Sequence, residues 1–156
     1  MACDPAASSR IAAFAAVAGA IYLNQTTQQP FPCALPSTRK DVPIMELHGK
    51  KDHQIEYEGG PNVNRDGATT VNVTDWVHLW VERDGLNVDQ DEPGVLCEGA
   101  NEVKTWKWGE TVEHYLYADM GHVWPSEFGN NDTQKRTCKE ADATRVLLDW
   151  FGKWSL

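Results

Sequence analysis

The stretch Val42-Pro-Ile-Met-Glu-Leu-His48-Gly49-Lys50-Lys51-Asp52 decides how the rest of the chain is interpreted. Its first seven residues are mostly apolar, which predicts a short buried strand over 42–48 that ends at Gly49. Two lysines and an aspartate follow directly, so the strand leads into a polar turn that carries Asp52. Open α/β sheets bind ligands beyond the carboxyl ends of their strands, and Asp52 therefore occupies a position where chemistry is common.

A second segment repeats this arrangement further along the chain. Strands are predicted over 103–108 and 112–119, joined by a turn at Gly109, and Gly121-His122 follow the second strand. An aspartate that fixes the tautomer of a later histidine is the second half of a Ser…Asp…His triad. We therefore expect Asp52 and His122 to be catalytic. The simpler alternative is that Asp52 forms a turn and His122 lies in its loop by chance.

Other titratable residues near these segments are weaker candidates. Asp119, at the end of the second strand, ranks below Asp52 as the partner of the histidine. His48, Asp52 and His53 together suggest a metal site, but neither an HExxH pattern nor a second ligand cluster supports one. We therefore expect no metal and no cofactor. Two further histidines are expected to be structural: His78 and His114.

Two amphipathic helices are predicted from apolar residues at helical spacing. The first apolar face consists of Val73, Trp76, Val77, Trp80 and Val81, with Gly85 placed to end the helix. The second consists of Ala143, Val146, Leu147, Trp150, Phe151 and Trp154. The polar segments 24–40 and 58–67 are predicted to be loops. This order of elements is typical of an α/β protein with a largely parallel sheet, but it supplies too few strands for a complete one.

Composition excludes several classes of partner. The 156 residues include 14 Lys and Arg against 23 Asp and Glu, a formal net charge of −9, which argues against nucleic acid and anionic membranes. The apolar run over 11–23 is too short for a membrane span, so we expect no membrane association. Seven tryptophans are a rich supply, common where polysaccharides or aromatic ligands are handled.

Cysteines and sequons point to an oxidising compartment. Four well-separated cysteines without a CxxC pair permit two disulfides in three pairings: Cys3, Cys33, Cys97 and Cys138. Three sequons predict N-glycosylation of Asn24, Asn72 and Asn131, as in a secreted eukaryotic protein. The run over 11–23 is interpreted as a buried strand and not as part of a signal peptide. Either Met1 is not the natural start, or the chain is a piece of a larger secreted protein.

Two segments together resemble the acid and base segments of secreted α/β-hydrolases. They are His48-Gly49-x-x-Asp52-x-x-Ile55-x-Tyr57 and Gly121-His122-x-Trp124-Pro125. The nearest group is the feruloyl esterases related to polyhydroxybutyrate depolymerases. Residues 2–20 resemble the end of the helix after the family's nucleophile elbow, followed by a core strand, and 33–45 is also similar. The resemblance implies a single partial domain over 1–156. It would be the C-terminal portion of an α/β-hydrolase fold, a mostly parallel sheet flanked by helices without the nucleophile-elbow half.

The resemblance also implies a function. The family's nucleophile is the serine of a G-x-S-x-G elbow, and none of the five serines here has that context. We therefore expect a fragment of a serine carboxylesterase that is inactive alone, with His122 as base and Asp52 as its partner. Trp124 would either bind the substrate or pack against the loop of the base. The substrates would be plant cell-wall polysaccharide esters such as feruloylated arabinoxylan. Alternatives are an acetylxylan esterase, a polyester depolymerase or a non-catalytic carbohydrate-binding protein.

Two further expectations follow from the resemblance. Cys3 and Cys33 flank the predicted core strand and its following loop, so they would pair, which leaves Cys97 with Cys138. An edge strand that the absent half would normally cover could allow self-association. The parent protein would be secreted.

Overall fold

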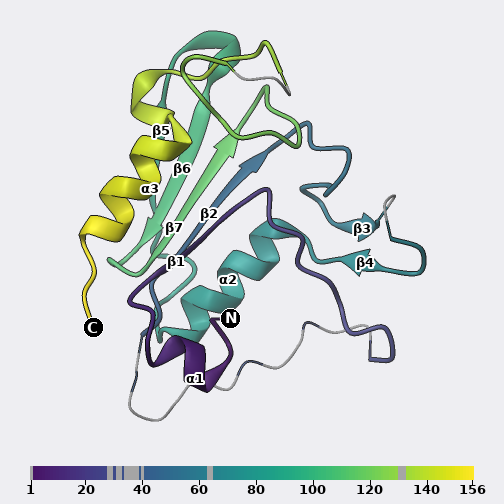
Figure 1. The fold of residues 1–156 in the computed structure, drawn as a ribbon, viewed down its shortest axis with the longest axis vertical. Helices are drawn as coiled ribbons and strands as arrows, with labels where there is room; N and C mark the ends of the chain where they lie inside the picture. Colours follow the sequence, from purple (N-terminus) through teal and green to yellow (C-terminus); the bar gives the residue numbers. More distant parts are fainter. Residues whose placement is uncertain are drawn as a thin grey trace.

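The computed structural model describes residues 2–27, 30, 33, 39, 41–62, 65–129 and 133–156. These residues form a five-stranded sheet of order β1-β2-β7-β6-β5, a small sheet of β3 and β4, and three α-helices (Figure 1). The strands are β1 (Phe14–Val17), β2 (Ile44–Gly49), β3 (Gly60–Pro61), β4 (Thr69–Thr70), β5 (Glu92–Leu96), β6 (Val103–Trp108) and β7 (Val112–Tyr117). The helices are α1 (Pro5–Ser8), α2 (Val73–Arg83) and α3 (Ala143–Gly152), with 3₁₀ turns η1 (Gly99–Asn101) and η2 (Lys139–Ala141).

The predicted fold class, the C-terminal portion of an α/β-hydrolase fold, is wrong. Strands β1, β2 and β7 are parallel, but β6 runs antiparallel to β7 and β5 antiparallel to β6. The sheet is therefore mixed and not mostly parallel. The described residues contain only three short α-helices, of 4, 11 and 10 residues, in place of a helix-flanked parallel sheet.

A short connection is the physical reason for the mixed sheet. Residues 109–111 alone join β6 to β7, and Gly109 has φ +53°. So few residues can join only antiparallel neighbours, because a parallel crossover needs about a dozen or more. Strand β5 was not predicted, because Pro93 and Gly94 interrupt any apolar alternation. A proline is tolerated there because β5 is an edge strand.

The N-terminal segment differs from the expectation. Helix α1 begins at Pro5, and the Asp4 side chain caps it by accepting from the Ala7 amide at 2.8 Å. Residues 2–4 therefore precede a helix and do not end one. A strand is present within 11–23, but only over β1, whose four residues are half-buried and not buried as predicted, and it is followed by Ala18 with φ +52°. Much of the predicted loop over 24–40 lies outside the described residues.

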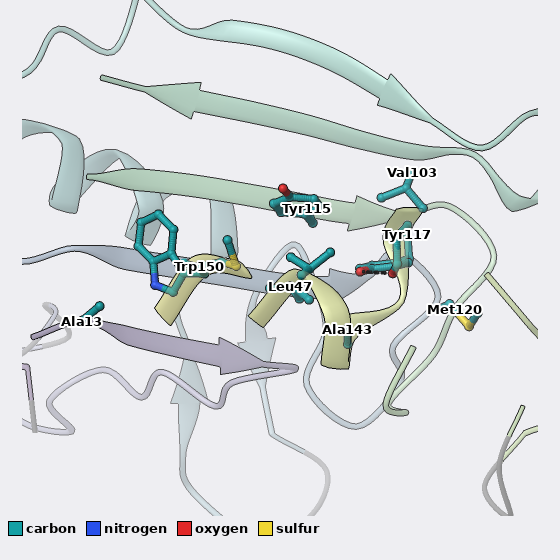
Figure 2. Packing of buried hydrophobic residues seen from close by; sticks show 11 residues of the cluster. Ala13, Leu47, Val103, Tyr115, Tyr117, Met120, Ala143 and Trp150 are labelled. Carbon is teal, nitrogen blue, oxygen red and sulfur yellow. Dashed lines mark hydrogen bonds between the residues drawn. The ribbon is translucent and has the colours of Figure 1, made fainter. Parts of the chain in front are cut away.

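One apolar core lies between α3 and the sheet. Val146 and Trp150 of α3 pack with Met45 and Leu47 of β2 and with neighbouring residues of β7 (Figure 2). The Trp150 indole also donates to the Phe14 carbonyl oxygen at 3.1 Å, which ties α3 to β1. The predicted C-terminal helix is confirmed, and Ala143, Val146 and Trp150 of its predicted apolar face are buried, but Phe151 is exposed and Trp154 lies beyond the end of the helix.

The opposite face of the sheet carries the second core, under α2. Val77 and Trp80 of this helix pack with Ile44 and Val112, whose side chains alternate with those facing α3. Asn72 caps the helix by accepting from the Asp75 amide, and the chain leaves it through Gly85, with φ +72°. The helix predicted over this region is confirmed, including its glycine terminator.

Two disulfides, Cys3–Cys33 and Cys97–Cys138, are present with the pairing that the resemblance implied. They bridge sequence separations of 30 and 41 residues. No helix among the described residues is long and apolar enough to cross a membrane. Within the described residues, β1 pairs only with β2 and β5 only with β6, so each outer edge of the sheet has no strand partner. Self-association through such an edge stays a prediction.

Candidate active site

Asp52 is placed by the turn that follows β2. Every residue of that strand is buried, and the turn closes with the Asp52 amide donating to the Gly49 carbonyl oxygen at 3.2 Å. The whole residue Asp52 is 3 % exposed. Its carboxylate oxygen Oδ1 accepts hydrogen bonds from the amides of Gln54 and Ile55, both at 2.8 Å. Two backbone donors on one oxygen hold the carboxylate in a single orientation.

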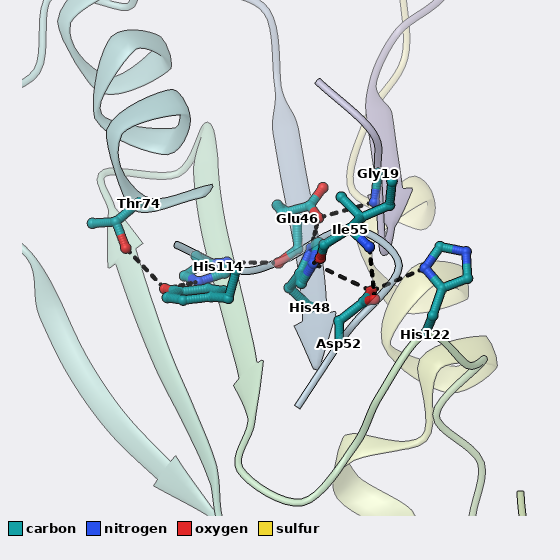
Figure 3. A network of polar contacts seen from close by, with 9 residues as sticks. Gly19, Glu46, His48, Asp52, Ile55, Thr74, His114 and His122 are labelled. Carbon is teal, nitrogen blue, oxygen red and sulfur yellow. Dashed lines mark hydrogen bonds and ion pairs between the residues drawn. The ribbon is translucent and has the colours of Figure 1, made fainter. Parts of the chain in front are cut away.

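His122 reaches Asp52 because two loops approach each other closely. The Lys51 amide donates to the Met120 carbonyl oxygen at 2.9 Å. A Cβ added at Gly49 would lie 2.4 Å from the carbonyl oxygens of both Met120 and Gly121, so only glycine fits there. The result is a hydrogen bond of 2.9 Å between His122 Nδ1 and Asp52 Oδ2 (Figure 3). The structure thus brings the two predicted residues together from sequence positions 70 residues apart.

The hydrogen bond determines the tautomer of His122. An ionised carboxylate only accepts, so Nδ1 carries the proton and Nε2 keeps its lone pair. Among the described residues, Asp52 is the only hydrogen-bond partner of this ring. Figure 3 shows the second ring nitrogen on the side away from Asp52. The His122 side chain is 36 % exposed, whereas that of Asp52 is fully buried. This arrangement suits a general base.

A cavity of about 200 Å³ adjoins the exposed side of His122. Its other lining residues are Val17, Ala18, Val123 and Trp124. Trp124 is 42 % exposed, and its indole nitrogen donates to the Thr144 hydroxyl of α3 at 3.2 Å. The hydrogen bond orients an aromatic wall beside the base, and the other lining residues are two valines and an alanine.

A buried acidic residue extends this network, and sequence reasoning missed it. His48 Nδ1 lies 2.9 Å from Glu46 Oε1, and its Nε2 lies 2.9 Å from the Ile55 carbonyl oxygen and 3.5 Å from Asp52 Oδ2 (Figure 3). Burial raises the pKa of Glu46 to about 7, against the opposing effect of His48. Burial lowers the pKa of His48, but the hydrogen bond and charge of Glu46 outweigh it, so the pKa is raised overall. The pair therefore holds a proton more tightly than the separate groups would.

His114 anchors the other side of this network and is structural, as expected. Its Nδ1 donates to the Glu46 carbonyl oxygen at 3.0 Å, so its Nε2 must accept from the Tyr57 hydroxyl at 2.9 Å. Tyr57 in turn accepts from Thr74 of α2. Burial lowers the pKa of His114 to about 4, which keeps the ring neutral.

The remaining candidates lie outside this network. Asp119 forms ion pairs with Lys51 at 2.5 Å and Lys135 at 2.9 Å, away from the His122 ring. His53 is exposed, and His78 packs edge-on against a tryptophan of β6. No group of three or more His, Cys, Asp or Glu side chains with metal-binding geometry occurs in the described part of the chain.

The sequons fall in different surroundings. Asn24 is half-buried, and its Oδ1 accepts from the amides of Thr26 and Thr27. Asn72 is the cap of α2, and its Nδ2 donates to Glu58 at 3.1 Å, so a glycan there would compete with this bond. Asn131 lies outside the described residues. Glycosylation stays a prediction at all three.

Comparisons with known proteins leave the family open. No protein-family model matches the chain, and a search of the curated proteins finds no match. The functional assignment therefore depends on the geometry of the Asp52–His122 pair and on the resemblance of the two segments that carry it.

Proposed function

We propose that this chain is part of a carboxylic-ester hydrolase in which Asp52 and His122 serve a nucleophilic serine. The observation that carries the proposal is the 2.9 Å hydrogen bond from His122 Nδ1 to the buried Asp52, while Nε2 has no hydrogen-bond partner among the described residues and lies beside a cavity. This is the arrangement that a histidine base requires, because the carboxylate fixes its tautomer and stabilises the imidazolium that forms. The serine would belong to a part of the parent protein outside this chain.

The proposed reaction proceeds through an acyl-enzyme. The serine oxygen forms a bond to the ester carbonyl carbon as its proton moves to His122 Nε2. The bond from that carbon to the alkoxy oxygen then breaks, and the departing alcohol takes the proton from Nε2. Water repeats the sequence, giving its proton to Nε2 as it attacks the acyl group, and serine recovers that proton as the acid leaves. Asp52 accepts the Nδ1–H bond throughout.

A hydroxycinnamoyl ester of arabinoxylan is the proposed substrate. Trp124 presents a partly exposed ring beside His122 in the cavity, which favours a flat acyl group over acetate. The resemblance to feruloyl esterases supports the same choice over acetylxylan esterases and polyester depolymerases. Two disulfides support the proposal that the parent protein is secreted.

An activated ester tests the base without the serine. The imidazole of His122 can attack p-nitrophenyl acetate directly, so the purified chain should hydrolyse it faster than His122→Ala does. Asp52→Asn should lower the His122-dependent rate by roughly 10-fold or more, because Asn can present its amide hydrogens to Nδ1 and so favour the other tautomer. His53→Ala is the control, since this exposed histidine lies in the same loop. Equal rates for wild type and His122→Ala would contradict the proposal.

Two further results test the source of the nucleophile. Methyl ferulate should not be turned over by this chain alone, and turnover would refute an external serine. Sequencing the transcript upstream of the Met1 codon should show an in-frame G-x-S-x-G motif. A stop codon with no such motif would contradict the esterase assignment, and binding of xylan fragments without hydrolysis would favour a carbohydrate-binding role.

A further inference from the structure

The proposed reaction makes no use of the buried pair formed by Glu46 and His48. Both side chains belong to β2, two residues apart, and therefore point to the same face of the strand. Both are fully buried, and the Nδ1–Oε1 distance is 2.9 Å. Burying two ionisable groups is costly unless they are paired. The pair lies next to Asp52, which suggests that it serves this residue although its burial lowers the stability of the fold.

The hydrogen bonds of Glu46 and His48 determine how many protons the pair carries. The Ile55 carbonyl can only accept, so His48 Nε2 carries a proton. The contact between Nδ1 and Oε1 contains one further proton, because two lone pairs at 2.9 Å would repel. That proton gives either an imidazolium with a carboxylate or a neutral imidazole with a carboxylic acid.

Two neighbours favour the charged form. The Gly19 amide approaches Glu46 Oε1 at 3.4 Å, and a backbone donor to this oxygen favours the carboxylate form of Glu46. Asp52 Oδ2 lies 3.5 Å from His48 Nε2, and its negative charge favours an imidazolium. The other titratable groups around the pair are Tyr57, His114 and, across Asp52, His122.

Glu46 also has an oxygen without a partner. Its Oε2 is buried and accepts no hydrogen bond from the described residues. A buried unsatisfied oxygen is rare in folded proteins and destabilises the fold. An apolar residue at position 46 would avoid this cost, so the buried carboxylate lowers the stability of the fold.

We propose that Glu46 and His48 are positioning residues for Asp52. Glu46 holds His48 as an imidazolium, and the Nε2–H of His48 ties the Ile55 carbonyl and the Asp52 carboxylate into one rigid turn. Glu46, His48 and Asp52 then form a row of alternating charge that ends at His122. The proposal rests on the proposed role of the Asp52–His122 pair.

The proton shared by Glu46 and His48 also determines the net charge of the buried groups near His122. With it, the three buried groups carry a net charge of −1, and without it the net charge would be −2. The proton on the pair therefore halves the net negative charge of these three groups, which lie next to the hydrogen bond between Asp52 and His122.

NMR of the whole chain with ¹⁵N-labelled histidine tests the protonation state. At about pH 7.5, both ring nitrogens of His48 should be protonated in the wild type. In Glu46→Gln, Nδ1 should lose its proton and leave the neutral Nε2–H tautomer. The matched control is Glu113→Gln, another buried carboxylate on β7 that pairs with Lys153 at 2.9 Å. A wild-type His48 with an unprotonated Nδ1 would overturn the proposal, whether or not the variants fold.

Two measurements at His122 distinguish a positioning role of Glu46 from a role in the stability of the fold alone. The Nδ1–H resonance of His122, which reports its bond to Asp52, should broaden or disappear in Glu46→Gln but not in Glu113→Gln. The His122-dependent rate with p-nitrophenyl acetate should fall by roughly 10-fold in the first variant alone, as for other residues that orient a reacting group indirectly. Unchanged resonance and rate in folded Glu46→Gln would overturn the positioning role. A wild type with no His122-dependent rate would instead count against the proposed function, and the NMR result would still decide the state of the pair.

Discussion

Replacing Gly49 by alanine should separate the two loops that carry Asp52 and His122. The added Cβ would lie 2.4 Å from the carbonyl oxygens of Met120 and Gly121 and 2.7 Å from the Met120 carbonyl carbon. All three are backbone atoms, so no side-chain rotation can relieve the contact. The loops must therefore move apart by several tenths of an ångström or more.

The cost follows from the kind of atom that is displaced. Overpacking a well-filled interior destabilises a protein by about 1–3 kcal/mol, and a clash with backbone atoms belongs at the upper end. About 3 kcal/mol is a more than 100-fold change in the folding equilibrium. The same displacement should lengthen the 2.9 Å bond between His122 and Asp52. Urea titration followed by tryptophan fluorescence measures the first effect, and the His122 Nδ1–H resonance measures the second.

Gly152→Ala is the matched control. This glycine ends α3, and a Cβ there would meet no atom within 4 Å. Alanine at a helical position is favoured over glycine, so this variant should be as stable as the wild type or more stable by up to about 1 kcal/mol. The reasoning would be refuted if Gly49→Ala unfolded at the same urea concentration as Gly152→Ala and kept the His122 resonance.

Three further predictions concern the scaffold around the site. Trp150→Ala should lower the free energy of unfolding by about 3–5 kcal/mol, because the indole is fully buried, while Trp154→Ala, at a partly buried position beyond α3, should cost less in the same urea titration. Replacing Cys97 and Cys138 by serine should cost about 4 kcal/mol, since their bond closes a separation of 41 residues, and an unchanged denaturation midpoint would contradict this. The lowered pKa of His114, about 4, means that the unfolded chain binds this proton below about pH 6.5 and the folded chain does not. Stability should therefore fall by up to about 3 kcal/mol from pH 6.5 to pH 4, and His114→Gln should lack this part of the pH dependence in urea titrations at each pH.

Local sequence patterns were sufficient for the parts of the fold in which neighbouring residues decide the conformation. The helices around Trp80 and Trp150 show apolar residues at helical spacing, and the turn at Gly109 joins two alternating strands. The polar turns after β2 and β7 were predicted for the same reason. Asp52 and His122 each follow a buried strand directly, so each could be identified within a window of about ten residues.

The tertiary structure decided what those patterns left open. The order of the strands depends on which neighbours each strand finds in the sheet, and the edge strand β5 was missed because its proline and glycine interrupt the apolar pattern. Glu46 was missed because a single carboxylate within an apolar run reads as part of a buried strand. Its significance comes from the distance to His48 and from full burial, which no local window contains.

The contact between Asp52 and His122 shows what the amino-acid sequence determines and what only the tertiary structure determines. Residue types and spacing were enough to propose the pair, because the chemistry of a carboxylate and an imidazole is a property of the side chains. Their 2.9 Å separation depends on parallel pairing of β2 with β7 and on a glycine that allows two backbones to touch. Asp52 and His122 are 70 residues apart and are brought together by packing, in which many weak contacts act together. Their contact is therefore established only when the whole sheet has formed.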